Sequence, residues 1–184
     1  WNLSSLHSAR NRRDRNQMTT TVSIVWFRRD LRIHDNPALD WALDNSSTVI
    51  PVYIHSPEEE APWSPGGASR WWLYRSLASL QDKLSEKGLT LNFFGGDSER
   101  CLTKIITETK ANKLVYNRLY ERHLYDRDQR VEKELTAKVG VSSFDSGLFF
   151  TPGTILNNQQ LPYRVYTPFY RKLRPLVSVS LSQD

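Results

Sequence analysis

The sequence is poor in sulfur and contains no long apolar run. Cys101 is the only cysteine and Met18 the only methionine among 184 residues. One cysteine excludes a disulfide framework and a thiolate metal site within the chain, and the scattered His34, His55 and His123 lack metal-ligand spacing, so we predict no metal site. No segment is long and apolar enough to span a membrane, and the N-terminus lacks a signal-peptide core. We therefore expect a cytoplasmic protein.

Both glycine-rich motifs that cradle phosphates in nucleotide-binding folds are also missing. No G-x-G-x-x-G follows a strand-like segment, and no G-x-x-x-x-G-K-[ST] occurs anywhere in the sequence. The sequence therefore predicts neither a glycine turn against a dinucleotide pyrophosphate nor a P-loop.

A strong net charge is lacking too, once the first 17 residues are set aside. The whole chain carries 25 lysines and arginines against 20 aspartates and glutamates. Residues 1–17 hold four of the basic and one of the acidic residues, which leaves 21 and 19 for the remainder. A nearly neutral body does not by itself indicate nucleic-acid binding. We interpret residues 1–17 as a disordered or non-native extension, with Met18 as the true start.

What the sequence does contain is a regular alternation of strand-like and helix-like segments. Short apolar, β-branched runs predict five strands, at Thr20–Phe27, Thr48–His55, Leu89–Phe94, Leu114–Tyr116 and Val141–Phe144. The segments between them predict four helices, which begin near Asp35 or Asn36, near Ser69, after Asp97 and near Tyr125, the last closed by Gly140. This alternation predicts a Rossmann-like doubly wound α/β fold, with a five-stranded parallel sheet in the order 3-2-1-4-5 and helices on both faces.

The alternation covers only part of the chain. We predict an α/β domain over residues 18–150 and a connector over residues 151–184, where four of the nine prolines lie. Within the connector, Tyr163–Leu173 mixes aromatic and basic residues. Such a mixture suits single-stranded nucleic acid, and it suits packing against another domain equally well.

Ligands of open α/β sheets bind beyond the carboxyl ends of the strands, where the strand order reverses. In the predicted order this point lies between strands one and four, so Arg28–Asn36 and Asn117–His123 are expected to line the crevice. The first segment carries three arginines interleaved with acidic residues. These arginines either tie down the loop through bidentate pairs or face a ligand.

Two further features of the sequence leave alternatives open. Glu121 either accepts hydrogen bonds from a planar, N–H-rich ring or forms a surface ion pair with Arg118 or Arg122. Trp71 and Trp72 point about 100° apart if they lie on a helix, so we expect one of them in the core and the other exposed or at an interface.

Several stretches, in this order, resemble one family. WFRRDLRIHDNPAL is similar to the first strand and loop of the photolyase/cryptochrome family, and YNRLYERHLYDRD and PYRVYTPFYRKL resemble its fourth-strand loop and the exit from its first domain. PEEEAPWSPGGASRWWLYRSL resembles plant cryptochromes and the plant-like class III bacterial photolyases of cyclobutane dimers. The resemblance covers about Val22 to Leu173.

The resemblance implies the N-terminal domain of a blue-light flavoprotein that repairs cyclobutane pyrimidine dimers in DNA, a deoxyribodipyrimidine photo-lyase. This domain would help to bind an antenna chromophore, expected to be methenyltetrahydrofolate. A helical C-terminal domain of the parent chain would bind FAD and damaged DNA. We therefore expect no catalytic residue in these 184 residues, no photorepair by them alone, and a monomer.

The resemblance also suggests which residues contact the antenna. Glu121 matches a carboxylate that folate-binding relatives direct toward the pterin, and Asn117 lies in the same loop. The other candidates are Arg29, Asp35 and Asn36. Leu119 stands where deazaflavin-binding relatives have an aspartate, which disfavours deazaflavin.

Two other functions remain open on the sequence alone. A cryptochrome photoreceptor would contain a very similar domain, and the residues that would distinguish repair from signalling belong to the lesion pocket of the other domain. A free-standing nucleotide- or pterin-binding module is the third hypothesis. The aromatic residues of the connector count against it, because an uncovered apolar surface normally has a partner.

Overall fold

The structure is a computed structural model that describes residues 20–177. The interpretation of residues 1–17, the role of Met18 and the last seven residues of the connector lie outside the described residues. The chain divides into two compact units, one ending at Ser146 and the other beginning at Gly147. Each unit is described by itself.

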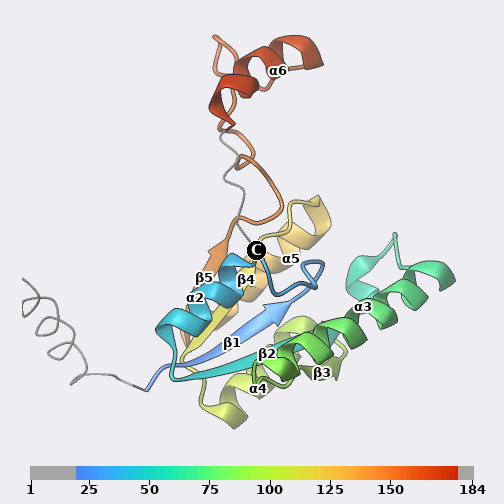
Figure 1. Ribbon diagram of the computed structural model, residues 1–184, viewed down its shortest axis with the longest axis vertical. Helices are drawn as coiled ribbons and strands as arrows, with labels where there is room; N and C mark the ends of the chain where they lie inside the picture. Colours follow the sequence, from blue (N-terminus) through green and yellow to red (C-terminus); the bar gives the residue numbers. More distant parts are fainter. Residues whose placement is uncertain (1–19, 178–184) are drawn as a thin grey trace, which may run out of the picture. The chain divides into compact units, whose positions relative to one another are not determined.

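The first unit is built on a parallel sheet of five strands (Figure 1). The strands are β1 (Val22–Phe27), β2 (Thr48–His55), β3 (Asn92–Gly95), β4 (Lys113–Asn117) and β5 (Gly140–Phe144). Their order is β3-β2-β1-β4-β5 and every pair is parallel, so the predicted fold and strand order are confirmed. Register places Trp26 of β1 beside Val52 of β2, which brings the carboxyl ends of the central strands to one edge.

Helices cover both faces of this sheet (Figure 1). They are α2 (Pro37–Asn45), α3 (Gly67–Glu86), α4 (Ser98–Thr109) and α5 (Arg122–Leu135), with a short 3-10 turn η3 (Pro57–Glu60) after β2. Side chains of β1 alternate between two cores because successive strand residues point to opposite faces. Ile24 and Trp26 pack with α4 and α5, whereas Val25 and Phe27 pack with α2 and α3.

Two of the predicted helix caps are confirmed. The side chain of Asn36 accepts a hydrogen bond from the Leu39 backbone N–H at 3.1 Å, and that of Asp97 accepts one from Arg100 N–H at 2.9 Å. Each cap satisfies an N–H group that has no partner within its own helix. The other cap candidate, Asp35, takes a left-handed backbone conformation with φ of 49°.

Three predicted helix ends are wrong. Helix α3 begins at Gly67 rather than at Ser69, and α5 begins at Arg122 rather than near Tyr125, where an Arg122–Asp126 pair supports the first turn. Gly140 does not close α5, which already ends at Leu135, but starts β5. A Cβ atom there would lie 2.6 Å from Nζ of Lys113, so a larger residue would require this flexible side chain to move.

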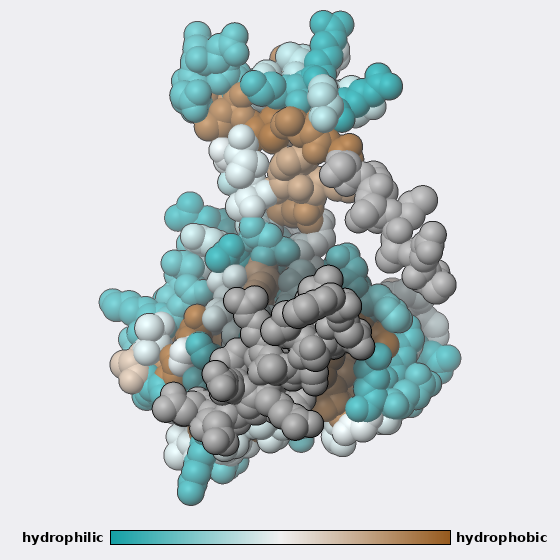
Figure 2. Space-filling model, turned by 60° about the vertical axis from the view of Figure 1, so that its left-hand side comes forward, coloured by the Kyte–Doolittle hydropathy of each residue, from teal (hydrophilic) through white to brown (hydrophobic). Residues whose placement is uncertain are grey.

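The second unit contains a short helix that the connector prediction did not include. Helix α6 (Tyr166–Leu173) is followed by a 3-10 turn η4 (Arg174–Leu176). Tyr166 and Tyr170 stack one helical turn apart, with ring centroids 5.6 Å apart. Figure 2 shows apolar atoms at the surface of this unit, to which the exposed Leu161, Val165 and Leu176 contribute. Over residues 20–177, no helix has the length and apolar character needed to cross a bilayer.

We expect the core around β1 to control the stability of the first unit. Leu102 of α4 is fully buried in it, so Leu102→Ala should lower the free energy of unfolding by about 2–5 kcal/mol. Leu43→Ala removes the same atoms from a side chain that is 44% exposed, and should change the free energy by only about 0.5 kcal/mol. Urea denaturation followed by circular dichroism measures both. Equal losses would contradict the placement of Leu102.

Candidate functional site

The first arginine after β1 is buried. Nη1 of Arg28 forms an ion pair with Asp128 of α5, and Nη2 donates to the backbone carbonyl of Asn117 at the end of β4. Its guanidinium lies over two aromatic rings, 4.6 Å from the centroid of Trp26 and 4.4 Å from that of Tyr116. Burial lowers the pKa of Arg28, and the Asp128 carboxylate opposes that shift.

A second buried arginine extends this cluster toward β2. Arg127 donates to the same Asp128 carboxylate, at 2.8 Å from Nη2, and its guanidinium lies 5.0 Å from the Trp26 ring. Nη1 of Arg127 also reaches Glu59 at 3.3 Å. Glu59 in turn accepts from the backbone N–H and the hydroxyl of Ser98, at the first turn of α4. Two cations and two carboxylates thus neutralise one another beneath the carboxyl edge of the sheet.

A second polar network fixes the loop that follows Arg28. The side-chain amide of Asn117 donates to Asp30 at 2.5 Å and to Asn36 at 2.7 Å. Its oxygen accepts from Ala38 N–H at 3.2 Å, and Asp30 accepts from the backbone of Arg28 at 2.9 Å. Asn36 and Asn117 are both buried, so their side-chain groups serve the loop itself.

Arg32 and Asp35 act mainly on their own loop. Arg32 donates to the backbone carbonyl of Asp35 through Nε and Nη2, at 3.0 and 2.9 Å, and to the Ser146 hydroxyl at 2.8 Å. The Asp35 carboxylate lies 3.2 Å from the same guanidinium and is itself largely exposed. The loop-stabilising interpretation therefore describes the contacts of Arg32, although Arg32 also lines the pocket, whereas Arg28 is bonded to α5 and to the end of β4.

Arg29 is different, because its side chain is half exposed and holds two carboxylates. Nη2 donates to Glu60 of η3 at 2.8 Å, and Nη1 pairs with Glu121, the residue that precedes α5. Glu121 is 44% exposed and makes no capping bond to its own helix. The arrangement leaves both carboxylates with oxygen atoms that can accept further hydrogen bonds.

Glu121 does form an ion pair near the surface, but with Arg29 rather than with Arg118 or Arg122, the partners considered in the open alternative. Arg118 pairs instead with Asp145 at 2.8 Å, and Arg122 pairs with Asp126 at 2.9 Å. Tyr120 also donates to Asp145, and partial burial together with that hydrogen bond raises the pKa of Tyr120 to about 12. These pairs hold the loop after β4, and Glu121 remains directed to Arg29.

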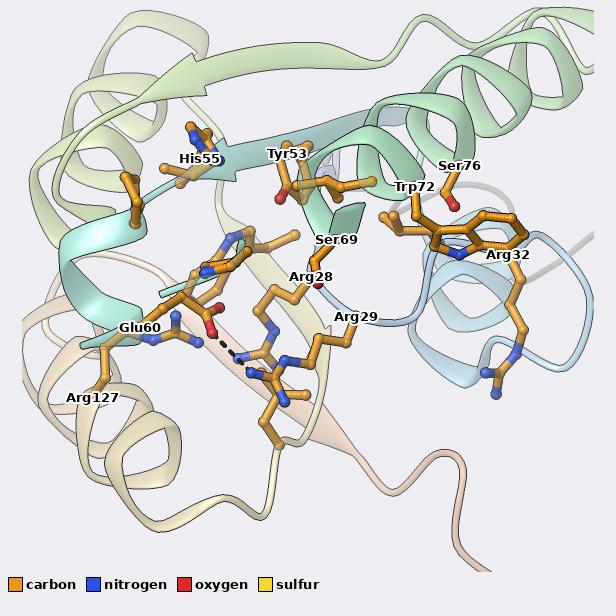
Figure 3. A pocket seen from close by; sticks show the side chains of 18 residues that line it. Arg28, Arg29, Arg32, Tyr53, His55, Glu60, Ser69, Trp72, Ser76 and Arg127 are labelled. Carbon is orange, nitrogen blue, oxygen red and sulfur yellow. Dashed lines mark hydrogen bonds and ion pairs between the residues drawn. The ribbon is translucent and has the colours of Figure 1, made fainter. Parts of the chain in front are cut away.

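A pocket of about 500 Å³ lies beside Arg29, at the carboxyl ends of β1 and β2 (Figure 3). Arg28 and Arg29 project between Glu60 on one side and Trp72 of α3 on the other. Half of the lining residues are apolar or aromatic and half are polar, with four arginines against one glutamate. The lining includes Trp26, Arg28, Arg29, Glu60 and Trp72.

The pocket coincides only in part with the predicted crevice. The first predicted segment contributes Arg28, Arg29, Leu31 and Arg32 to the lining, and the second contributes Leu119. Most of the other lining residues come from β2, η3 and α3 rather than from the β4 side of β1. The reason is that the polar network of Asn36 and Asn117 fills the β1–β4 edge. Of the five candidate antenna residues, only Arg29 lines the pocket. Glu121 and Asp35 are not in the lining, but each is bonded to an arginine that is, Glu121 to Arg29 and Asp35 to Arg32.

The sequence did not predict that Glu60 and Trp72 line the pocket. Glu60 lies in PEEEAP, a stretch noted only for its family resemblance, and three adjacent glutamates give no signal for which one faces a pocket. The prediction that either Trp71 or Trp72 is a core residue is wrong, since both are more than 60% exposed. The fully buried residues of α3 are Leu80 and Leu84, in its second half, whereas the first half packs on the core through the partly buried Leu73 and leaves Trp71 and Trp72 exposed.

Comparison with known proteins identifies the family of the chain. The family model described as DNA photolyase matches residues 23–182. The chain belongs to the DNA photolyase family. Within residues 20–177 of this photolyase domain, no cluster of His, Cys, Asp and Glu is arranged to hold a metal ion.

Individual relatives include both photolyases and cryptochromes. The photolyase domain is 41% identical over 157 residues to a deoxyribodipyrimidine photo-lyase of Agrobacterium fabrum, covering 85% of this chain and 32% of the relative. It is 38% identical over 152 residues to cryptochrome-1 of Arabidopsis thaliana, covering 82% of this chain and 22% of the relative. A bacterial class III photolyase structure from Agrobacterium tumefaciens superposes with a TM-score of 0.79 and 40% identity, over 87% of this chain and 33% of that one. The chain thus spans about a third or less of the length of these relatives.

The ion pair between Arg28 and Asp128 should be essential for the stability of the photolyase domain. Asp128→Asn leaves the buried guanidinium without a counter-charge, which should lower the free energy of unfolding by about 3–5 kcal/mol. Glu108→Gln makes the same chemical change in an exposed pair with Lys104, and should change it by about 0.5 kcal/mol or less. Urea denaturation of the two variants compares the effects. A loss at Asp128 no larger than that at Glu108 would show that the buried pair is dispensable.

Proposed function

We propose that this chain is the antenna-binding domain of a light-driven deoxyribodipyrimidine photo-lyase. Its pocket would take a planar antenna chromophore, and methenyltetrahydrofolate is the candidate that the family resemblance favours. In the parent protein the chromophore would absorb light and pass the excitation to FAD in a second domain. Repair of pyrimidine dimers in DNA would belong to that complete protein. We also propose that it works in the cytoplasm as a monomer.

The observation that carries this proposal is the pocket itself. Its volume of about 500 Å³ lies within the roughly 300–1,000 Å³ of small-molecule sites. Trp72 lines it with 68% of the residue exposed and with its ring centroid 6.4 Å from that of Trp71. An exposed indole at the edge of the pocket offers a face on which a planar ring can stack.

The charged rim suits a ring that carries N–H groups. Glu60 lines the pocket, and its carboxylate keeps acceptor positions beyond its bond to Arg29. Glu121 shares the same arginine and is the more exposed of the two. A chromophore whose edge donates hydrogen bonds would compete with Arg29 for these carboxylates. In this arrangement Glu60 and Glu121 bind the ring, Arg29 positions them, and Asn36 and Asn117 hold the loop that carries Arg29.

A cryptochrome is the second candidate, favoured by the 38% identity to cryptochrome-1 of Arabidopsis thaliana. Antenna binding is common to both proposals. They differ in what the rest of the parent chain does with the excitation, either repair of DNA or light signalling.

The tryptophan at the pocket should contribute to chromophore affinity. Trp72→Ala removes the stacking face and should weaken binding of methenyltetrahydrofolate to the 184-residue chain about 10-fold. Trp63→Ala is the control, because Trp63 is similarly exposed and does not line the pocket, whereas the ring of Trp71 contacts that of Trp72. Equilibrium dialysis gives both affinities. An equal effect of the two substitutions would contradict the role of Trp72, and absence of binding by the parent chain would contradict the proposed function.

The charge of the Glu121 carboxylate, which precedes α5, should contribute to folate affinity. Glu121→Gln keeps the size of the side chain but removes its charge, so it should accept N–H bonds more weakly and lower folate affinity by about 5- to 10-fold. Asp126→Asn removes a carboxylate from the first turns of the same helix and should leave affinity unchanged. The two variants are compared by the same dialysis. Folate binding as tight in Glu121→Gln as in the parent would rule out Glu121 as a ligand residue.

A further inference from the structure

Two residues of the pocket lining have an N–H group without an acceptor. Trp26 is 1% exposed and Arg28 is 7% exposed, and both line the pocket. Nε1 of Trp26 and Nε of Arg28 are buried and have no hydrogen-bond partner among the described residues. The guanidinium of Arg28 lies 4.6 Å from the Trp26 ring centroid, so the two donors belong to one cluster.

Leaving such donors unpaired is unfavourable. A buried donor without an acceptor costs about 1–3 kcal/mol, and nearly all buried polar groups have a partner. The other donors of this cluster follow that rule. Both terminal nitrogens of Arg28 are bonded, to Asp128 and to the carbonyl of Asn117, and Arg127 is bonded to Asp128 and Glu59.

The nearby acceptors are already committed to other donors. One oxygen of Asp128 pairs with Arg28 Nη1 and the other with Arg127, while Glu59 is held by Ser98 and Arg127. The Arg28 guanidinium also lies against the rings of Trp26 and Tyr116, which offer no acceptor oxygen in the plane of its N–H groups. Both nitrogens are fully enclosed, so an acceptor that enters from the pocket would reach them only after lining side chains move.

We propose that Trp26 Nε1–H and Arg28 Nε–H form an acceptor-binding subsite for the inward edge of the chromophore. This proposal rests on the proposed function and adds to it which chemical group of the chromophore the domain recognises. The ligand would carry a ring carbonyl, as in the cyclic amide edge shared by pterins and isoalloxazines. Stacking on Trp72 accepts any planar ring of suitable size, whereas the subsite selects rings by their carbonyl group.

The test uses Trp26→Phe in the 184-residue chain. Phenylalanine keeps an aromatic ring for Arg28 and Arg127 but has no N–H group. The probes are methenyltetrahydrofolate, riboflavin and acridine, a planar ring of comparable width without a carbonyl group. We expect Trp26→Phe to bind methenyltetrahydrofolate or riboflavin, whichever the parent binds, about 10-fold more weakly. Its affinity for acridine should change less than 2-fold. Trp41→Phe, at a half-buried tryptophan outside the pocket lining, is the control and should change neither.

Each outcome decides the proposal. If Trp26→Phe binds the carbonyl-bearing ring as tightly as the parent does, the subsite is wrong and the proposed function still stands. The same conclusion follows if Trp26→Phe loses as much affinity for acridine as for the carbonyl-bearing ring. If the parent binds neither carbonyl-bearing ring, both proposals are wrong. The two carbonyl-bearing probes also distinguish a pterin from an isoalloxazine as the source of the carbonyl.

A second measurement holds even if Trp26→Phe does not fold. The parent chain labelled with 15N at its six tryptophans gives indole N–H signals, among which the buried Trp26 should exchange slowly with solvent. We expect this signal to move downfield when the ligand binds, as a new hydrogen bond forms. A signal that stays in place at saturating ligand overturns the subsite.

Discussion

The ion pair of Arg28 with Asp128 is the interaction on which the carboxyl edge of the sheet depends. It joins the residue after β1 to the middle of α5, and Arg28 also binds the backbone at the end of β4. A guanidinium can satisfy such separate acceptors because its donors form a planar fork, and its face can lie against aromatic rings at the same time. Trp26 and Tyr116 supply those rings. Charge is thereby placed where a dinucleotide-binding fold would have a glycine turn.

The same interaction accounts for the position of the pocket. With Arg28 directed toward α5 and the Asn36–Asn117 pair filling the space beside β4, the edge between β1 and β4 is occupied by the protein itself. The space that remains lies over β1 and β2, under the first half of α3. The charges beside it are of two kinds. Arg28, Arg127 and Asp128 are buried and neutralise one another, whereas Arg29, Glu60 and Glu121 are partly exposed and can exchange partners.

Periodicity and cap chemistry were sufficient to predict the sheet, its strand order and the Asn36 and Asp97 caps, because these depend on local pattern and on rules of chain connection. The pocket was not predictable in this way. Whether Glu59 or Glu60 faces it depends on how η3 turns after β2, and the partner of Glu121 is 92 residues away in the sequence. The exposure of Trp71 and Trp72 shows the same limit. Helical spacing determines which residues share a face, but only the extent of the neighbouring sheet determines whether that face is covered.

The division between buried and exposed charge has a consequence for specificity. A rim of partly exposed ion pairs is screened by water and salt, so it favours a class of ligand without selecting strongly within it. Buried donors act differently, because a ligand that lacks the matching acceptor leaves them unpaired and loses affinity for that reason. The unpaired nitrogens of Trp26 and Arg28 are of this second kind and lie within the cluster that stabilises the fold. Arg28 is held by Asp128 and by the backbone of β4, so its side chain is fixed before any ligand arrives. Because its Nε is enclosed, selection of the ligand edge would require nearby lining side chains to move.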